Sequence, residues 1–483
     1  MRRGAGLGVL VVLACGPEPL VPAELAEVCG QEEPFRLLAL EPGQALFWRP
    51  QIFGDRAYFQ IVPDDDYEHT FVRSTGMCGE DLVALDPTVR RVFTRDRWPG
   101  LVLGTRTDGD IVLVDPQGVE PSHVVFAGVG AGSYVRWTDV GIVVTEHRED
   151  AWGAAFFYPY PADPRAETVQ RAPLYDPVPI TGQAGEVYSI HFELLGDDLL
   201  MVSAEGHLVR VAVPDGSVAI EQPGVREFAL SSDQRYLLWQ ANHVVNDDSW
   251  DPRDDIFLRD LQDGHDTFLT VGNLWGFTDA YGATEPRRIL VNNGPNADGR
   301  VRQRLYAMST LEYADLPEDY WFHATVPDGR WLISTSTQGA PVDLFDPKDG
   351  GVRHLIGMNR GLYKHILADG IEVLDVTEYQ GSQGPLYFVP FDGSPPRTLA
   401  DEITSDSVRL DDGRYVSIID IGGGGLGEFV LLDTGDRTAT SIDDRVNARW
   451  GVSSSPEFGA NAFVYSVNDG DRSGIWVARI PER

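Results

Sequence analysis

One segment of the chain concentrates carboxylates. Five aspartates fall within nine residues: Asp247, Asp248, Asp251, Asp254 and Asp255. Carboxylate oxygens are preferred ligands of Ca²⁺, so this segment is a candidate calcium site. We expect it to form the loop between the second and third strands of its repeat. The alternative is a solvated acidic loop, because the chain is acidic throughout.

Residues for nucleophilic catalysis are not arranged in a recognisable motif. The Gly-x-Ser-x-Gly elbow is absent, and the string around Ser382 lacks its spacing and falls between two expected strands. None of the ten histidines stands at metal-ligand spacing from another. His191, His243 and His323 fall on or beside expected inner strands, where we interpret them as hydrogen-bonded core or channel residues. We therefore assign no catalytic residue, and no cofactor apart from the calcium ion considered above.

The N-terminal segment has the pattern of an export signal. Arg2 and Arg3 precede an apolar run from Gly4 to Ala14. At about 11 residues, this run is shorter than the roughly 20 that a membrane-spanning helix needs. The segment therefore predicts secretion rather than a transmembrane anchor.

The end of this signal, Val12-Leu13-Ala14-Cys15, resembles the lipobox of bacterial lipoproteins. In that family the cysteine is acylated and becomes the mature N-terminus. Leu13 stands where the family prefers a small residue, so an ordinary cleaved signal is the alternative. The resemblance implies a signal peptide at residues 1–14, a lipid anchor and linker at residues 15–34, and a place at the outer membrane or in the periplasm.

The two other cysteines are Cys29 and Cys78. An even pair in an exported chain predicts a disulfide, and two buried free thiols are the alternative. The chain has no Cys-x-x-Cys motif and no Cys/His cluster. Zinc and redox motifs are therefore excluded.

The charge balance excludes two classes of partner. The chain has 74 Asp and Glu residues against 39 Lys and Arg residues, for a net charge of -35. This charge repels phosphate backbones and anionic lipids. We expect no nucleic-acid partner and no membrane contact beyond the lipid anchor. Because 42% of the residues are hydrophobic, the chain is a globular one rather than a disordered one.

Two series of Gly-containing turns recur through the C-terminal half. Asp328-Gly329, Asp369-Gly370 and Asp412-Gly413 form one series, and a second series alternates with it, both with a period of ~42 residues. Each period reads as four short strands joined by turns, with a strongly hydrophobic second strand. Four antiparallel strands per repeat are typical of a β-propeller blade.

About ten such units fall between residues 43 and 483. We expect an all-β propeller of about eight four-stranded blades in one ring, with up to ten blades allowed and two rings as the alternative. The last unit lacks an outer strand, and Arg36 to Pro42 is expected to supply it and close the ring. Alternation then predicts Leu38 and Leu40 on a buried face and Leu37 and Ala39 on the other.

Three turns carry a more specific pattern: Ser231 to Trp239, Val326 to Ser334 and Asp411 to Ile419. They resemble the Ser-Pro-Asp-Gly turn of TolB-like propellers, which implies a propeller over residues 35–483. We do not expect the additional N-terminal α/β domain of TolB. The tryptophans near blade strands are expected to pack between sheets: Trp48, Trp137, Trp239, Trp331 and Trp450.

Together these features favour a non-enzymatic, monomeric binding or scaffold module. It would be exported, anchored at the envelope, and bind an envelope protein, a peptide or a glycan. The alternative is a hydrolase or lyase of polysaccharide or peptide, because propellers can bring carboxylates from several blades into one channel, which sequence spacing does not reveal.

Overall fold

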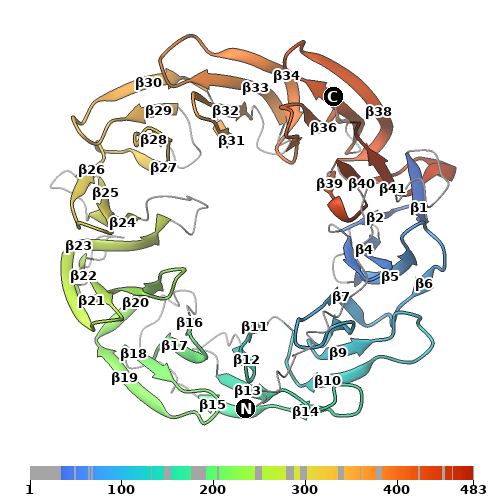
Figure 1. Ribbon diagram of the computed structural model, residues 1–483, viewed down its shortest axis with the longest axis horizontal. Coiled ribbons are helices and arrows are strands. Elements are labelled where there is room, and N and C mark those ends of the chain that lie inside the picture. Colours follow the sequence, from blue (N-terminus) through green and yellow to red (C-terminus); the bar gives the residue numbers. More distant parts are fainter. Residues whose placement is uncertain are drawn as a thin grey trace, which may run out of the picture.

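The computed structural model describes residues 34–47, 50–63, 66, 69–131, 133–145, 154–175, 192–203, 206–244, 253–278, 288–293, 302–335, 342–358, 361–376, 383–422, 425–448, 452–458 and 461–481. These residues form antiparallel sheets that follow one another around a single ring (Figure 1). The only helices among them are two single 3-10 turns, η4 (Pro456–Phe458) and η5 (Gly470–Arg472). No described helix is long and apolar enough to cross a membrane. The fold is the all-β propeller that the repeats predict.

The first half of the ring contains five blades, whose strands follow one another from the inside of the ring outward. Blade 1 is β2 (Gln44–Leu46) and β3 (Gln51–Phe53), then β4 (Arg56–Pro63), β5 (Phe71–Gly76) and β6 (Val83–Ala84). Blade 2 is β7 (Val89–Phe93), β8 (Val102–Arg106), β9 (Ile111–Val114) and β10 (His123–Ala127), with β14 (Val169–Gln170) added in parallel to β10. Blade 3 is β11 (Tyr134–Trp137), β12 (Gly141–Thr145), β13 (Ala155–Pro159) and β15 (Ala172–Tyr175). Blade 4 is β16 (Phe192–Leu195), β17 (Asp198–Val202), β18 (His207–Val211) and β19 (Val218–Pro223). Blade 5 is β20 (Val225–Leu230), β21 (Tyr236–Val244), β22 (Arg253–Asp260) and the first part of β23 (His265–Phe277).

The second half contains five more. Blade 6 is the last part of β23, then β24 (Arg288–Asn293), β25 (Arg302–Ala307) and β26 (Tyr313–Asp315). Blade 7 is β27 (Trp321–Thr325), β28 (Trp331–Ser334), β29 (Val342–Phe345) and β30 (Val352–Ile356). Blade 8 is β31 (Gly361–Ile366), β32 (Gly370–Asp375), β33 (Gln383–Pro390) and β34 (Arg397–Thr404). Blade 9 is β35 (Val408–Arg409), β36 (Tyr415–Ile419), β37 (Leu426–Asp433) and β38 (Thr438–Asn447). Blade 10 is β39 (Ser453–Ser454), β40 (Ala462–Val467), β41 (Gly474–Arg479) and β1 (Phe35–Ala39).

The described strands form fewer sheets than repeats, because neighbouring repeats are joined at two places. The described strands form eight continuous sheets, two of which contain two repeats each. In one of them β23 pairs with β22 up to Gly272 and with β24 from Gly272 onward, so one long strand is outer in blade 5 and inner in blade 6. In the other a single bridge, Val446 with Val467, joins blades 9 and 10. The described strands therefore form ten repeats, the upper limit that the sequence allowed, rather than about eight.

The two ends of the described chain meet in blade 10. β1 pairs antiparallel with β41, with Phe35 opposite Val477 and Arg36 opposite Trp476. The predicted outer strand is thus confirmed. The predicted division of its faces holds for the buried Leu38 and Leu40 and for the exposed Ala39, but it is wrong for Leu37. Leu37 is buried next to Leu38, because the register shifts between Arg36 and Leu38. A bulge inserts an extra residue and lets consecutive side chains face the same side.

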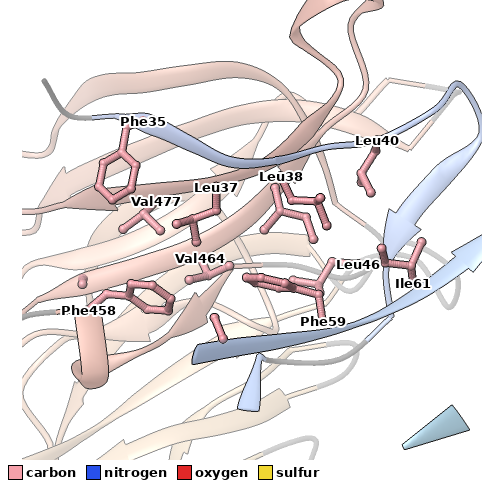
Figure 2. Close-up of a cluster of buried hydrophobic side chains, with 13 residues drawn as sticks. Phe35, Leu37, Leu38, Leu40, Leu46, Phe59, Ile61, Phe458, Val464 and Val477 are labelled. Atoms are coloured by element: carbon pink, nitrogen blue, oxygen red, sulfur yellow. The ribbon is translucent and has the colours of Figure 1, made fainter. Parts of the chain in front are cut away.

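The junction between the last and first blades is a hydrophobic cluster. Phe35, Leu37 and Leu38 of β1 pack with residues from both chain ends, among them Phe59 of β4 and Val464 of β40 (Figure 2). Burying each such side chain contributes roughly 1.5–3 kcal/mol. The cluster therefore holds the two ends of the ring together through packing as well as through the β1–β41 ladder.

The TolB-like turns have a common local structure. In two of them a glycine takes a positive φ, +90° at Gly329 and +85° at Gly413, which an L side chain adopts only with strain. The preceding aspartate accepts a hydrogen bond from the backbone N–H two residues on, from Arg330 to Asp328 and from Arg414 to Asp412. This Asp-Gly-Arg geometry precedes the hydrophobic second strands β28 and β36.

Candidate functional site

The structure describes two of the five aspartates in the candidate calcium site. Asp247, Asp248 and Asp251 lie outside the described residues. Asp254 and Asp255 lie within β22 rather than in the loop before it, because the β21–β22 ladder extends to Val244 opposite Arg253. Asp254 is fully buried, and Nη1 of Arg226 is 3.8 Å from its Oδ2. Among the described residues, no three His, Cys, Asp or Glu side chains are placed to hold a metal ion.

The predicted cysteine sites are only partly described. Cys78 is disulfide-bonded and lies in the turn after β5, where its N–H donates to Oε2 of Glu80 at 2.9 Å. Cys15 and Cys29 both lie outside the described residues. The pairing of Cys29 with Cys78 and the acylation of Cys15 stay predictions.

The histidines and tryptophans that the structure describes have structural roles. Nε2 of His323 is 2.6 Å from Oγ of the buried Ser334, and burial lowers the pKa of His323 to about 4. Trp137, Trp239 and Trp331 pack within hydrophobic clusters between blades, as predicted. His191, Ser382, Trp48 and Trp450 lie outside the described residues, as does the side chain of His243.

The inner strands of the ring carry more basic than acidic residues, whereas the chain as a whole is acidic. We call these strands the inner rim: β2, β3, β7, β11, β16, β20, the last part of β23, β27, β31, β35 and β39 (Figure 1). They carry two acidic residues, Glu193 and Glu227, and six basic ones: Arg90, Arg91, Arg136, Arg226, Lys364 and Arg409. The outer strands of the ten blades carry seven acidic and four basic residues. The inner strands thus carry an excess of basic residues, whereas the outer strands carry an excess of acidic ones.

Some rim cations are neutralised within the fold. At the junction of blades 8 and 9, Oε2 of the buried Glu372 accepts a hydrogen bond from the Tyr415 hydroxyl at 2.5 Å. The same oxygen lies 3.1 Å from Nε of Arg409. Burial raises the pKa of Tyr415, and its hydrogen bond to Glu372 raises it further. Lys364 donates from its ammonium group to the backbone oxygens of Ser405 and Ser407. These contacts join two blades.

The rim carboxylate Glu227 is held in a different environment. Nε2 of Gln240 donates to its Oε2 at 3.1 Å. Desolvation raises the pKa of Glu227, and the neighbouring Arg226 opposes this shift. A carboxyl group with a raised pKa on an inner strand is suited to proton transfer.

Three of the rim cations lie in blades 2 and 3, and Arg95 and Arg97 follow directly after the inner strand β7. We call this group the arginine–aromatic patch: Arg90, Arg91, Arg95, Arg97 and Arg136, with the rings that three of these arginines cover. Cζ of Arg95 lies 4.4 Å from the ring centre of Trp137 and 5.3 Å from that of Phe93. Cζ of Arg97 lies 4.2 Å from the Tyr160 ring. Cζ of Arg136 lies 5.2 Å from the ring of Phe192, in blade 4.

Four of these arginines have no carboxylate partner among the described residues, unlike Arg304, Arg330 and Arg414, each of which pairs with an aspartate. Within the part of the chain that the structure describes, Arg90, Arg91, Arg95 and Arg136 form no ion pair, and Nε of Arg90 is buried without a hydrogen-bond partner. Arg91, Arg95 and Arg136 are exposed. Partial desolvation lowers the pKa of Arg95, Tyr160 and the adjacent Asp96 oppose this shift, and the charge of Arg91 adds to it. The patch therefore presents guanidinium groups to solvent in a protein that has an excess of carboxylates.

The patch was not predicted from the sequence. Its local signals are the Arg90-Arg91 pair and the alternation of Tyr134, Val135, Arg136 and Trp137. Both look like ordinary strand sequence until the ring shows that β7 and β11 are inner strands. Guanidinium groups held flat by aromatic rings direct their N–H donors outward in one plane, the geometry that carboxylates and phosphates accept in pairs.

Comparisons with known proteins find only distant similarities. No protein-family description and no curated protein matches the chain. Solved structures with similar folds include an oligogalacturonate lyase in complex with manganese, with 12% identity over 79% of this chain and 97% of that one and a TM-score of 0.26. TolB from Acinetobacter baumannii has 14% identity over 64% of this chain and 78% of that one, with a TM-score of 0.24. The computationally designed Ika8 protein has 12% identity over 92% and 99%, with a TM-score of 0.29. Similarities this low say nothing about a ligand.

Proposed function

We propose that this protein is a non-enzymatic binding module of the bacterial envelope, exported and anchored through an acylated Cys15. Its inner rim binds the anionic groups of a peptide, glycan or protein. One observation carries the proposal: the rim is basic in a chain with a net charge of -35. The lipobox-like segment before Cys15 supports the location.

Arg226 and Arg409 of the rim face carboxylates, but Arg90, Arg91 and Arg136 form no ion pair within the described residues. With 74 acidic residues available, turn arginines such as Arg330 and Arg414 have aspartate partners at 2.6 Å. A like-charged cluster without partners is destabilised by its own repulsion. Binding of an anion removes that repulsion and adds charge-assisted hydrogen bonds, each contributing about 1.5–3 kcal/mol.

The net charge of the whole protein limits which anions can bind. At physiological ionic strength the electrostatic interaction between charges is screened beyond about 8 Å. The basic residues of the rim therefore attract mainly those anionic groups of a ligand that lie close to them. A densely charged polymer would contact the acidic outer surface as well as the rim. The rim therefore favours a ligand with a few well-spaced anionic groups, which agrees with the exclusion of nucleic acids.

Equilibrium binding to oligomeric anions tests this function. Tetraglutamate, tripolyphosphate and a tetrasaccharide of uronic acid are titrated into the purified mature protein by calorimetry at 50 and 300 mM NaCl. We expect at least one of them to bind, more weakly at the higher salt concentration, and to be recovered chemically unchanged. If none binds at 50 mM NaCl, the proposed function is wrong.

The enzymatic alternative rests on Glu227. Its raised pKa suits a general acid, and Glu193 on the neighbouring inner strand β16 is the other acidic residue of the described rim. Cleavage of any of the oligomers by the wild-type protein, lost in Glu227→Gln, would establish this alternative. Turnover that survives Glu227→Gln would exclude Glu227 as the general acid.

A further inference from the structure

We infer that the arginine–aromatic patch binds an acidic oligosaccharide, one that carries a carboxylate on successive sugars. This inference rests on the proposed function and narrows it to one place and one ligand class. Arg95 and Arg97 lie where blade 2 meets blade 3, since Phe93 at the end of β7 contacts Trp137 at the end of β11 with ring centres 5.8 Å apart. Arg136 lies on the other side of β11, toward blade 4.

The aromatic rings hold the guanidinium groups in place. Trp137 packs edge-on against Phe126 and almost parallel to Tyr160, so the rings under Arg95 and Arg97 belong to one packed cluster. A guanidinium that stacks on a fixed ring loses little further freedom when it binds. Arg95 and Arg97 are thereby oriented before a ligand arrives, and a carboxylate can be met by two parallel N–H donors.

Tyr134 supplies an apolar surface on the other side of β11, beside Arg136. It lies two residues before Arg136, on the same side of the strand. Tyr134 is 52% exposed, and its ring centre lies 6.2 Å from that of Phe192 in blade 4. An exposed tyrosine ring offers both an apolar face, on which the C–H groups of a sugar can pack, and a hydroxyl group for hydrogen bonds. Tyr134 and Arg136 on one side of β11, with Arg95 on the other, match a chain of acidic sugars that crosses this strand.

The strand edges at this place favour a carbohydrate over an extended peptide. A peptide that binds by strand addition needs a regular free edge. β11 has only four residues, and the pairing of β7 is interrupted by a register shift between Val89 and Arg91. The patch therefore recognises its ligand mainly through side chains. Guanidinium groups and an exposed ring are complementary to carboxylates and sugar faces.

Calorimetry with defined tetrasaccharides tests the inference. A uronic-acid tetrasaccharide is compared with the neutral maltotetraose and with tetraglutamate, using wild type, Arg95→Gln, Arg136→Gln and Tyr134→Ala. The matched control is Arg397→Gln. Arg397 is also exposed and stacks on a ring, with Cζ 4.8 Å from Phe388, but it lies on the outer strand β34. Thermal unfolding of each variant verifies that it is folded.

We expect the uronic-acid tetrasaccharide to bind and maltotetraose not to bind. Arg95→Gln and Arg136→Gln should each weaken binding about tenfold, which corresponds to the loss of one charge-assisted hydrogen bond. Tyr134→Ala should weaken it severalfold, and Arg397→Gln should leave it unchanged.

Three results would overturn the inference. Equal binding of maltotetraose would show that the carboxylates are not recognised. Equal losses in Arg397→Gln and Arg95→Gln would show that the patch is not the site. Patch-dependent binding of tetraglutamate without binding of the tetrasaccharide would refute the ligand class while leaving the proposed function intact, whereas failure of every anion would refute both.

Discussion

The arginines of this protein differ in what their guanidinium groups contact. Arg330 and Arg414 pair with the aspartates of their own turns and stabilise the repeat. Arg95 and Arg136 stack on aromatic rings and have no carboxylate partner among the described residues. The same side chain is thus used for the fold in one place and is left available for a ligand in another.

The acylation of Cys15 is a prediction for single-residue chemistry. Protein extracted from the cell envelope should have Cys15 as its first residue, carrying a diacylglyceryl group, because the preceding segment resembles a lipobox. Mass spectrometry of the N-terminal peptide measures this directly. Cys15→Ala should release the protein from the membrane fraction, and an unmodified N-terminus at another residue would contradict the prediction.

His323 predicts a pH dependence of stability. Burial lowers the pKa of His323 from 6.5 to about 4. This histidine is therefore protonated below about pH 6.5 in the unfolded chain but only below about pH 4 in the folded protein. This contribution to stability is fully present above pH 6.5 and is lost as the pH falls toward 4. Between pH 7.5 and pH 5 the free energy of unfolding should fall in both proteins. We expect it to fall by about 2 kcal/mol less in His323→Gln than in wild type.

Urea denaturation at the two pH values measures this difference. The exposed His265 serves as a control, since His265→Gln should behave like wild type. The role of His323 would be disproved if His323→Gln and wild type lost the same stability on acidification.

Strand β1 is the element on which the closure of the ring depends. It was predicted from two features of the sequence, the missing outer strand of the last repeat and the apolar segment before the first repeat. Its exact faces were not predictable, because the bulge between Arg36 and Leu38 arises from its pairing with β41. In the same way, the Asp254 position depends on how far the β21–β22 ladder extends, which a loop-like sequence does not reveal.

Truncation of Leu38 tests the closure. Leu38 is 3% exposed within the cluster that joins the first and last blades. Leu38→Ala should lower the free energy of unfolding by about 2–5 kcal/mol, the usual result for a buried leucine. Deletion of residues 16–22, which we expect to be a tether, should have almost no effect. Equal unfolding midpoints for Leu38→Ala and wild type would show that β1 does not secure the ring.

At the scale of the whole molecule, ten repeats form one ring whose inner and outer strands differ in charge. The turns that define the repeats are local, since an aspartate and a positive-φ glycine act within a few residues, and they were therefore visible in the sequence. The arginine–aromatic patch was not, because whether a strand lies at the inner rim is decided only when the blades assemble. The candidate site is thus a property of the ring rather than of any one repeat.

The central claim is that anions bind at the inner rim, and two triple variants of equal net charge test it most directly. One replaces Arg91, Arg95 and Arg136 with glutamine, and the other replaces the outer-strand residues Arg353, Arg397 and Arg445. The measurement is the affinity of each variant for the anion that wild type binds most tightly. We predict that the inner variant binds at least a hundredfold more weakly, from the loss of two or more charge-assisted contacts, and that the outer variant binds like wild type. Equal weakening of both variants would show that only the net charge of the protein matters, and would contradict the claim.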